Sequence, residues 1–395
     1  MKRFIASLLA LSLVVAGFAQ TPGKEAKATA GEARVKQQSS YTPSFKNDGK
    51  DKKVRNVILL IGDGMGVGAV NAAMYANGGA LTMTNLKTCG YVRTQSANNF
   101  TTDSAASGTA YATGVKTNNG YVGLDTDKQP LLNLPERLEP LGFACGVLST
   151  DNLDGATPAS FFAHQANRRA GEEIWADLAA SHLAFASAGS SKVFEGLPLK
   201  VREEINDRFD VIYSPEGQEK LLGESERLAY FPPSVTLPER GDYLPATTQM
   251  AIDFLSARSK KGFFLMVEGA RIDKEEHKNN YQGMVDETLD FDKAIEAAIR
   301  FAEKDGHTLV IISADHETGG VTLSRGVPEE GLIQGVFASM GHTPIMVPLF
   351  AYGPHSRDFS ELMRRFRPAR RLVRSAAGKR YLQNKDFVVT LSSRL

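Results

Sequence analysis

The segment VRNVILLIGDG, residues 54–64, carries an apolar run into an aspartate that is flanked by two glycines. Residues 57–61 are all branched and apolar, which is typical of a strand buried on both faces of a parallel sheet. The glycines allow a tight turn, so Asp63 should stand just past the carboxyl end of that strand. Open α/β sheets place their chemistry at these ends. Taken alone, such an aspartate is as often a turn or helix-capping residue.

Two later segments repeat this form. GFFLMVEGARIDKEEH, residues 262–277, carries Glu268, Asp273 and His277, and HTLVIISADHE, residues 307–317, carries Asp315 and His316. The i, i+4 spacing of Asp273 and His277 puts both on one face of a helix, where they could share a metal or form a surface ion pair. Three parallel strands would bring these carboxylates and imidazoles to one edge of the sheet. That mixture of donors suits zinc and magnesium.

Strand-like and helix-like patterns alternate along most of the chain. Strands are expected at 54–61, 142–150, 262–268, 308–313 and 347–354, with a shorter one in 209–214. Amphipathic helices are expected within 171–189, 246–261 and 284–304. This order predicts an α/β fold with a mostly parallel central β-sheet and helices on both faces. We assign one catalytic domain to 51–360, in which 190–245 lacks a clean period and is expected to be an insertion over the sheet.

The two ends of the chain differ from this domain. Residues 1–19 are basic and then apolar, which indicates a secretory signal peptide and a periplasmic or secreted protein; an uncleaved anchor is the alternative. Residues 20–50 are polar and are expected to be a flexible lead-in. Residues 361–395 form a basic tail, expected to be a solvated surface, with anionic lipid or polysaccharide as the alternative partner. No later segment is apolar enough to span a bilayer. Cys89 and Cys145 could form a disulfide or remain free thiols.

The composition is that of an ordinary globular protein. The 395 residues carry a net charge of +1, so nothing global indicates binding to nucleic acid.

The Ser-, Thr- and Gly-rich segment 101–120 predicts a short helix from Asp103 to Gly114. Ser104 at its start is the candidate nucleophile, because a bound zinc could deprotonate its hydroxyl without a histidine. A helix-capping serine is the alternative. His342 lies in a Gly-flanked turn, where most histidines are not ligands.

Six motifs in this order carry a resemblance to a known family: GDGMG (62–66), TDSAASGTAYATG (102–114), ATPASFFAHQANR (156–168), VEGARIDKEEH (267–277), ADHETGG (314–320) and GHT (341–343). The chain resembles the alkaline phosphatases, in particular the bacterial metal-dependent phosphomonoesterases. The likeness runs from about Val54 to about His355. It implies a sandwich of the alkaline phosphatase type and hydrolysis of small-molecule phosphate monoesters, with a homodimer as a possible assembly.

The resemblance also implies roles for single residues. Ser104 would take up phosphate covalently, and Arg168 would hold the phosphoryl oxygens, as a planar guanidinium can. Two Zn²⁺ ions and one Mg²⁺ are implied as cofactors. The first zinc would be held by Asp273, His277 and His342, the second by Asp63, Asp315 and His316, and the magnesium by Asp63, Thr157 and Glu268.

Some positions depart from the family pattern or leave alternatives. Gly155 stands where some members place a carboxylate or imidazole near the third metal. Lys274 could reach phosphate through water or remain solvated, and Arg169 is a rival of Arg168. A phosphodiesterase or sulfatase of the same superfamily is the enzymatic alternative, although an arginine at position 168 favours monoesters. A non-catalytic phosphate- or metal-binding protein is the alternative from another class.

Overall fold

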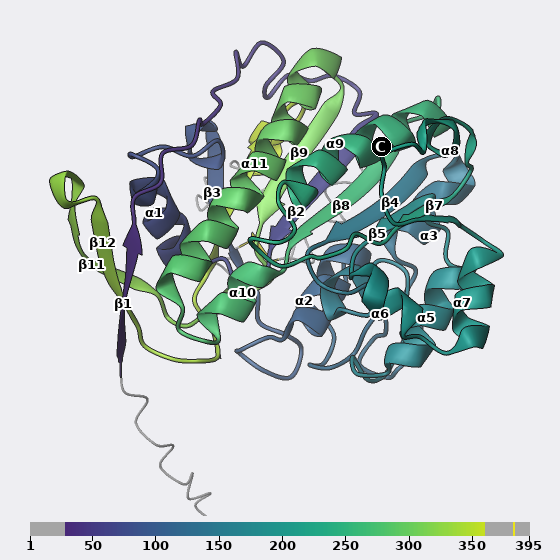
Figure 1. The fold of residues 1–395 in the computed structure, drawn as a ribbon, viewed down its shortest axis with the longest axis horizontal. Coiled ribbons are helices and arrows are strands. Elements are labelled where there is room, and N and C mark those ends of the chain that lie inside the picture. The colour runs from purple at the N-terminus through teal and green to yellow at the C-terminus, as the bar shows by residue number, and fades with distance from the viewer. Residues whose placement is uncertain (1–27, 360–381, 384–395) are drawn as a thin grey trace, which may run out of the picture.

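The computed structural model describes residues 28–359 and 382–383. Its centre is a ten-stranded sheet (Figure 1). From one edge to the other the strands are β15 (Leu382–Gln383), β3 (Thr88–Arg93), β14 (Val347–Tyr352), β9 (Thr308–Ser313), β2 (Asn56–Gly62), β8 (Phe263–Gly269), β4 (Ala144–Ser149), β5 (Phe185–Ser187), β7 (Leu228–Tyr230) and β6 (Asp210–Ile212). The predicted signal peptide and nearly all of the basic tail lie outside the described residues.

The seven strands from β9 to β6 are parallel, and β14 runs antiparallel to both β9 and β3. Every residue of β2, β8, β4 and β9 is buried. This burial explains why these strands appear in the sequence as continuous apolar runs. The predicted strand at 347–354 exists, but it reverses direction, which a run of apolar residues cannot indicate.

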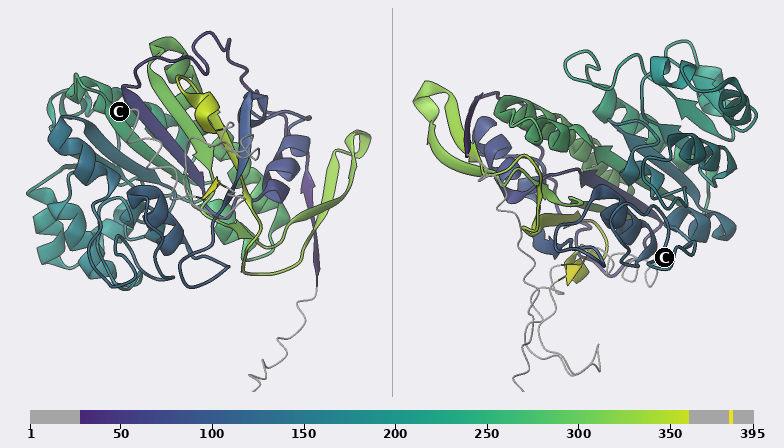
Figure 2. Two further views of the ribbon diagram at one scale, coloured as in Figure 1. Left: turned by 180° about the vertical axis from the view of Figure 1, so that it is seen from behind. Right: turned by 90° about the horizontal axis from the view of Figure 1, so that it is seen from below.

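Helices cover both faces of the sheet, so the predicted fold class is confirmed. The helices are α1 (Val67–Ala76), α2 (Ser104–Thr113), α3 (Leu134–Leu138), α4 (Ala156–Ala159), α5 (Gly171–Ala180), α6 (Ser191–Glu195), α7 (Leu199–Asn206), α8 (Glu219–Glu224), α9 (Tyr243–Arg258), α10 (Arg271–Glu276) and α11 (Tyr281–Asp305). The long helices α9 and α11 cross the face nearest the viewer in Figure 1, and α2 lies on the opposite face (Figure 2).

A small sheet stands apart from the large one. It consists of β1 (Thr29–Arg34), β12 (Leu332–Phe337) and β11 (Thr322–Val327), and it projects at the left of Figure 1. Residues 29–34 were expected to belong to a flexible lead-in, and the structure corrects this: β1 pairs antiparallel with β12 over its whole length. The pairing joins segments about three hundred residues apart, so local composition could not indicate it.

The segment 190–245 also differs from the expectation. It was predicted to lie over the sheet, but its strands β7 and β6 extend the sheet in its own plane, beyond β5. Helices α6, α7 and α8 connect these short strands. Strands of three residues carry too little periodicity to be recognised in a sequence.

Two further expectations can be compared with the structure. Cys89 is exposed and Cys145 is buried, and both are free thiols.

Within residues 28–359, no helix combines the length and the apolar character that crossing a membrane requires.

A buried ion cluster fastens α9 to α11. The side chain of Arg240, just before α9, is fully buried and donates two hydrogen bonds to Glu287, at 3.0 and 2.6 Å, and one to Asp290 at 2.6 Å. Glu287 and Asp290 both belong to α11. Because α11 packs against α10, the cluster also supports the helix that carries Asp273.

We predict that Arg240→Met lowers the free energy of unfolding by about 3–5 kcal/mol, because it removes the cation that is hydrogen-bonded to two buried carboxylates and leaves Glu287 with the more distant Arg271, at 3.9 Å. Lys200→Met is the matched control, since its ion pair with Glu204 is exposed, and this change should stay within about 0.5 kcal/mol. Urea denaturation of both variants measures the difference. Equal effects of the two substitutions would show that the cluster is not a stabilising anchor.

Candidate active site

Three neighbouring strands deliver the candidate ligands to one edge of the sheet. In the ladder, Ile61 of β2 lies opposite Glu268 of β8 on one side and Ser313 of β9 on the other. Gly62, the last residue of β2, lies opposite Gly269, the last residue of β8, so Asp63 stands just past this edge and Glu268 just before it. Asp315 follows β9 there as well. Helix α10 begins directly after β8 and adds Asp273, whose N–H donates to the carbonyl of Asp63 at 2.9 Å.

His342 reaches this edge through a second, smaller pairing. Strands β10 (Glu317–Thr318) and β13 (His342–Thr343) form a two-stranded antiparallel ladder in which Thr318 lies opposite His342. The residues between them form the projecting hairpin β11–β12. This short ladder next to His316 thus places His342 at the site, although more than twenty residues separate the two strands in the sequence.

Asp63, Asp315 and His316 form one compact group, in which the offered ligand atoms all lie within 4.8 Å of one another. His316 Nε2 lies 3.4 Å from Asp63 Oδ1 and 3.2 Å from Asp315 Oδ2. Asp315 Oδ1 accepts hydrogen bonds from the N–H groups of Gly64 and His316, so its other oxygen faces the predicted zinc ligands. This is the group of residues predicted to hold the second zinc. The cluster formed by the six predicted zinc ligands is called the cage below.

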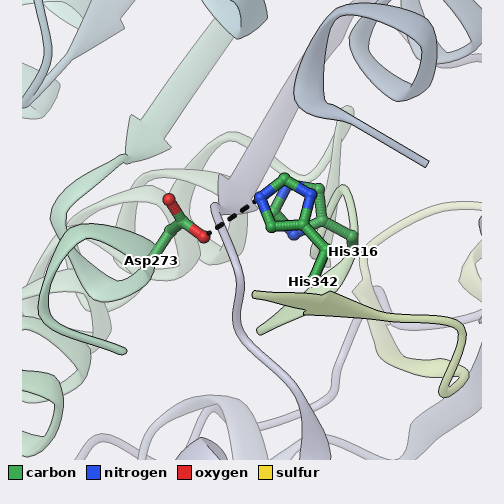
Figure 3. Close-up of side chains that lie close together, drawn as sticks. All are labelled: Asp273, His316 and His342. Carbon is green, nitrogen blue, oxygen red and sulfur yellow. Dashed lines mark ion pairs between the residues drawn. The ribbon is translucent and has the colours of Figure 1, made fainter. Parts of the chain in front are cut away.

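Asp273, His316 and His342 form a second group within the same limit. The rings of His316 and His342 stack with centroids 3.5 Å apart, and Asp273 Oδ1 lies 3.6 Å from His342 Nε2 (Figure 3). His277, predicted as the third ligand of the first zinc, lies beside them with Nε2 3.3 Å from Asp273 Oδ2. The structure therefore gathers all six predicted zinc ligands, and His316 belongs to both compact groups.

The charges of this cage do not balance without cations. Burial, followed by repulsion from Asp315 and Asp273, raises the pKa of Asp63 well above its usual value. Burial and the charge of Asp273 raise the pKa of Asp315 to about 7. Asp63 Oδ1 and Asp315 Oδ2 are buried and have no hydrogen-bond partner among the described residues. These carboxylate oxygens lie beside His316, whose pKa burial holds well below its usual value, and such a mixture of donors is what zinc takes, so these residues fit the implied ions.

Ser104 is the first residue of α2 and points at this cage. Its Oγ is buried and lies 3.2 Å from His316 Nε2. Asp103 caps the helix by accepting from the N–H of Ala106 at 3.0 Å, and Gly114 ends the helix in the left-handed conformation, with φ of 80°. The N-terminus of this ten-residue helix favours an anion beside the hydroxyl.

Arg168 is held by the same carboxylate that caps α2. Its Nη1 donates to Asp103 Oδ2 at 3.0 Å, and about a third of the Arg168 side chain remains exposed. The neighbouring Arg169 is an exposed residue. Arg168 is therefore the arginine tied to the Ser104 helix. The role of Asp103 was missed in the sequence because its capping position already explained an aspartate there.

A third cluster lies behind Asp63, around Glu268. The Glu268 carboxylate accepts a hydrogen bond from Ser149 Oγ, and the hydroxyl of Thr157, buried beside it, also favours its charged form. Burial, and then repulsion from Asp151, raises the pKa of Glu268 to about 8. A buried hydroxyl and a carboxylate are oxygen ligands, so they fit the implied magnesium.

The side chain of Asp151 fills the space next to Gly155. A Cβ built on Gly155 would lie 3.0 Å from Asp151 Oδ2 and 2.9 Å from the carbonyl of Asn152. Asp151 also forms an ion pair with Lys274. The amine of Lys274, predicted to reach phosphate through water or to be solvated, is thus paired with a carboxylate at the edge of the third cluster. Sequence reasoning considered only position 155 and missed Asp151.

Comparisons with known proteins agree with this geometry. The family model for alkaline phosphatase matches residues 54–193 and 238–365, which is more than half of the chain. The unmatched residues 194–237 contain α7, β6, α8 and β7.

Individual relatives match over most of their length. The chain is 30% identical to the alkaline phosphatase of Escherichia coli, covering 80% of this chain and 85% of that protein. It is 31% identical to alkaline phosphatase H of Pseudomonas aeruginosa, covering 84% and 87%. The solved alkaline phosphatase of the Antarctic bacterium TAB5 superposes with a TM-score of 0.76 at 31% identity, covering 87% and 98%. A variant of that enzyme, with a TM-score of 0.75, is described with Mg bound. Sequence motifs, fold and gathered ligands coincide, and the chain belongs to the alkaline phosphatase family.

Proposed function

We propose that this protein is an exported alkaline phosphatase that hydrolyses phosphate monoesters through a phosphoserine at Ser104, with two zinc ions and a third, magnesium site. The observation that carries the proposal is the position of Ser104 Oγ, 3.2 Å from the imidazole that belongs to both compact ligand groups. Export is supported by the basic and then apolar residues 1–19. The predicted homodimer stays a prediction.

In this mechanism the protein's residues position and stabilise the phosphoryl group. The N-terminus of α2 and the guanidinium of Arg168 attract its oxygens, and Asp103 holds Arg168 in place. Ser104 Oγ attacks phosphorus in line, so that its bond to phosphorus forms as the bond to the leaving alcohol breaks, and water then hydrolyses the phosphoserine. Zinc, when bound by the predicted ligands, would lower the pKa of the attacking groups and neutralise charge on the leaving oxygen.

We predict that Ser104→Ala abolishes phosphoenzyme formation and most turnover, while the variant keeps its zinc, because Ser104 is none of the predicted ligands. Labelled phosphate trapped on the protein at acid pH, together with metal content per chain, measures both quantities. Ser107→Ala, one turn along the same helix, should still take up label. Rates on aryl monoester, diester and sulfate ester should rank monoester first. Near-normal turnover of Ser104→Ala would contradict the mechanism.

We predict that the metal-free protein loses stability as the pH rises from 5 to 8. Asp315, with a pKa of about 7, and Glu268, with a pKa of about 8, retain protons in the folded state that an unfolded chain releases near pH 4. Folding therefore binds protons, and raising the pH favours unfolding. Asp315→Asn removes one of these groups, so its midpoint in urea should fall less over this range. The same fall in both proteins would refute the prediction.

We predict that Asp151→Asn weakens magnesium binding to the zinc-loaded protein, because it removes a negative charge close to Glu268 and releases Lys274. The measurement is a calorimetric titration with Mg²⁺, in which the dissociation constant should rise several-fold. Asp207→Asn, an exposed carboxylate at the end of α7, is the control and should bind magnesium normally. An unchanged dissociation constant in Asp151→Asn would mean that Asp151 takes no part in the third site.

A further inference from the structure

The three histidines of the cage share one orientation. Each turns Nε2 toward the cage and Nδ1 toward an oxygen behind it. His277 Nδ1 lies 2.6 Å from the carbonyl of Met340, and His342 Nδ1 lies 2.9 Å from the carbonyl of Thr102. A carbonyl oxygen can only accept a hydrogen bond, so these two rings must carry their hydrogen on Nδ1. Their Nε2 lone pairs are then free for a ligand, as a metal requires.

His316 has the same orientation, but the partner of its Nδ1 is a hydroxyl and not a carbonyl oxygen. Its Nδ1 lies 3.2 Å from Thr318 Oγ1. A hydroxyl can donate as well as accept, so this contact alone would not determine which nitrogen of His316 carries the hydrogen. The ambiguity matters because His316 faces Ser104 and belongs to both ligand groups.

The second contact of Thr318 removes the ambiguity. Thr318 Oγ1 lies 2.7 Å from Asp273 Oδ1 and donates to it. A carboxylate accepts hydrogen bonds, so Asp273 offers no hydrogen to Thr318 in return. The single hydroxyl hydrogen of Thr318 is thus committed, and only its lone pairs face His316.

We propose that Thr318 is a positioning residue that sets the tautomer of His316 through the relay His316 Nδ1–H to Thr318 Oγ1, and Thr318 Oγ1–H to Asp273 Oδ1. The backbone holds the hydroxyl in place, since Thr318 is fully buried, its N–H donates to the carbonyl of Gly64 at 3.1 Å, and it pairs with His342 in the β10–β13 ladder. The relay links Asp273 in one ligand group to His316, which serves both.

Loss of the hydroxyl would favour the wrong tautomer. Without an acceptor, Nδ1–H would be buried and unpaired, which costs about 1–3 kcal/mol. On the other side of the ring, the oxygens of Asp63 and Asp315 lie 3.4 and 3.2 Å from Nε2 and would accept a hydrogen there. The ring would then direct an N–H group, instead of a lone pair, at Ser104 and at the predicted zinc.

The test compares Thr318→Val, which removes the hydroxyl but keeps the shape, with Thr318→Ser, which keeps the hydroxyl. In metal-free protein, nitrogen-15 correlation spectra of the His316 ring should show the Nδ1–H tautomer in the wild type and in Thr318→Ser, and a shift to Nε2–H in Thr318→Val. Zinc affinity should fall about 10- to 100-fold in Thr318→Val, as for other residues that orient a ligand, and stay within about threefold in Thr318→Ser. Thr248→Val, which removes a buried hydroxyl that bonds only within α9, should change neither quantity.

The measurement of zinc affinity rests on the proposed function, whereas the measurement of the His316 tautomer does not. If the wild type binds no zinc pair but Thr318→Val still shifts the tautomer, the two-zinc proposal fails and the relay stands. If Thr318→Val keeps both the wild-type tautomer and the wild-type zinc affinity, the relay is refuted. A loss in Thr318→Ser equal to that in Thr318→Val would also refute it, since packing of the methyl group would then be the cause.

Discussion

The site depends on bringing carboxylates together where water cannot screen them. Asp63, Glu268 and Asp315 are all buried, and burial together with repulsion from neighbouring carboxylates raises the pKa of each. Such a cage is unfavourable in isolation, because each charge loses hydration and gains like-charged neighbours. The scaffold tolerates it because β2, β8 and β9 are buried strands whose register places Asp63 and Asp315 at one level, with Glu268 two residues before it. Bound cations would convert the same repulsion into affinity.

Much of this architecture could be predicted from the sequence, for physical reasons. Strands buried on both faces must be apolar throughout, so β2, β4, β8 and β9 stand out as runs. Helix α2 could be located because Asp103 and Gly114 are strong start and stop signals. Candidate ligands that directly follow such strands, Asp63 and Asp315, could be assigned to one edge of the sheet by the same reasoning.

What could not be predicted depends on contacts between distant segments. β1 forms because β12 offers it an edge, although its own residues, TAGEAR, include no large apolar side chain. His342 becomes part of the cage through a two-residue ladder, far too short to be visible in a sequence. Asp151, Asp103 and Thr318 act on other side chains through hydrogen bonds and ion pairs, and nothing in their local sequence distinguishes them from ordinary capping or turn residues.

Asp103 shows how closely the parts of the site are coupled. One carboxylate oxygen caps the helix that begins with Ser104, and the other accepts from Arg168 and from the N–H of Gly120. The candidate nucleophile and the candidate phosphate-binding arginine are therefore set by a single side chain, and a shift of either must move the other. A capping bond contributes only about 1 kcal/mol to stability, so the larger consequence of Asp103 is geometric. It keeps the distance between the attacking hydroxyl and the guanidinium constant, as an in-line attack on a bound phosphoryl group requires.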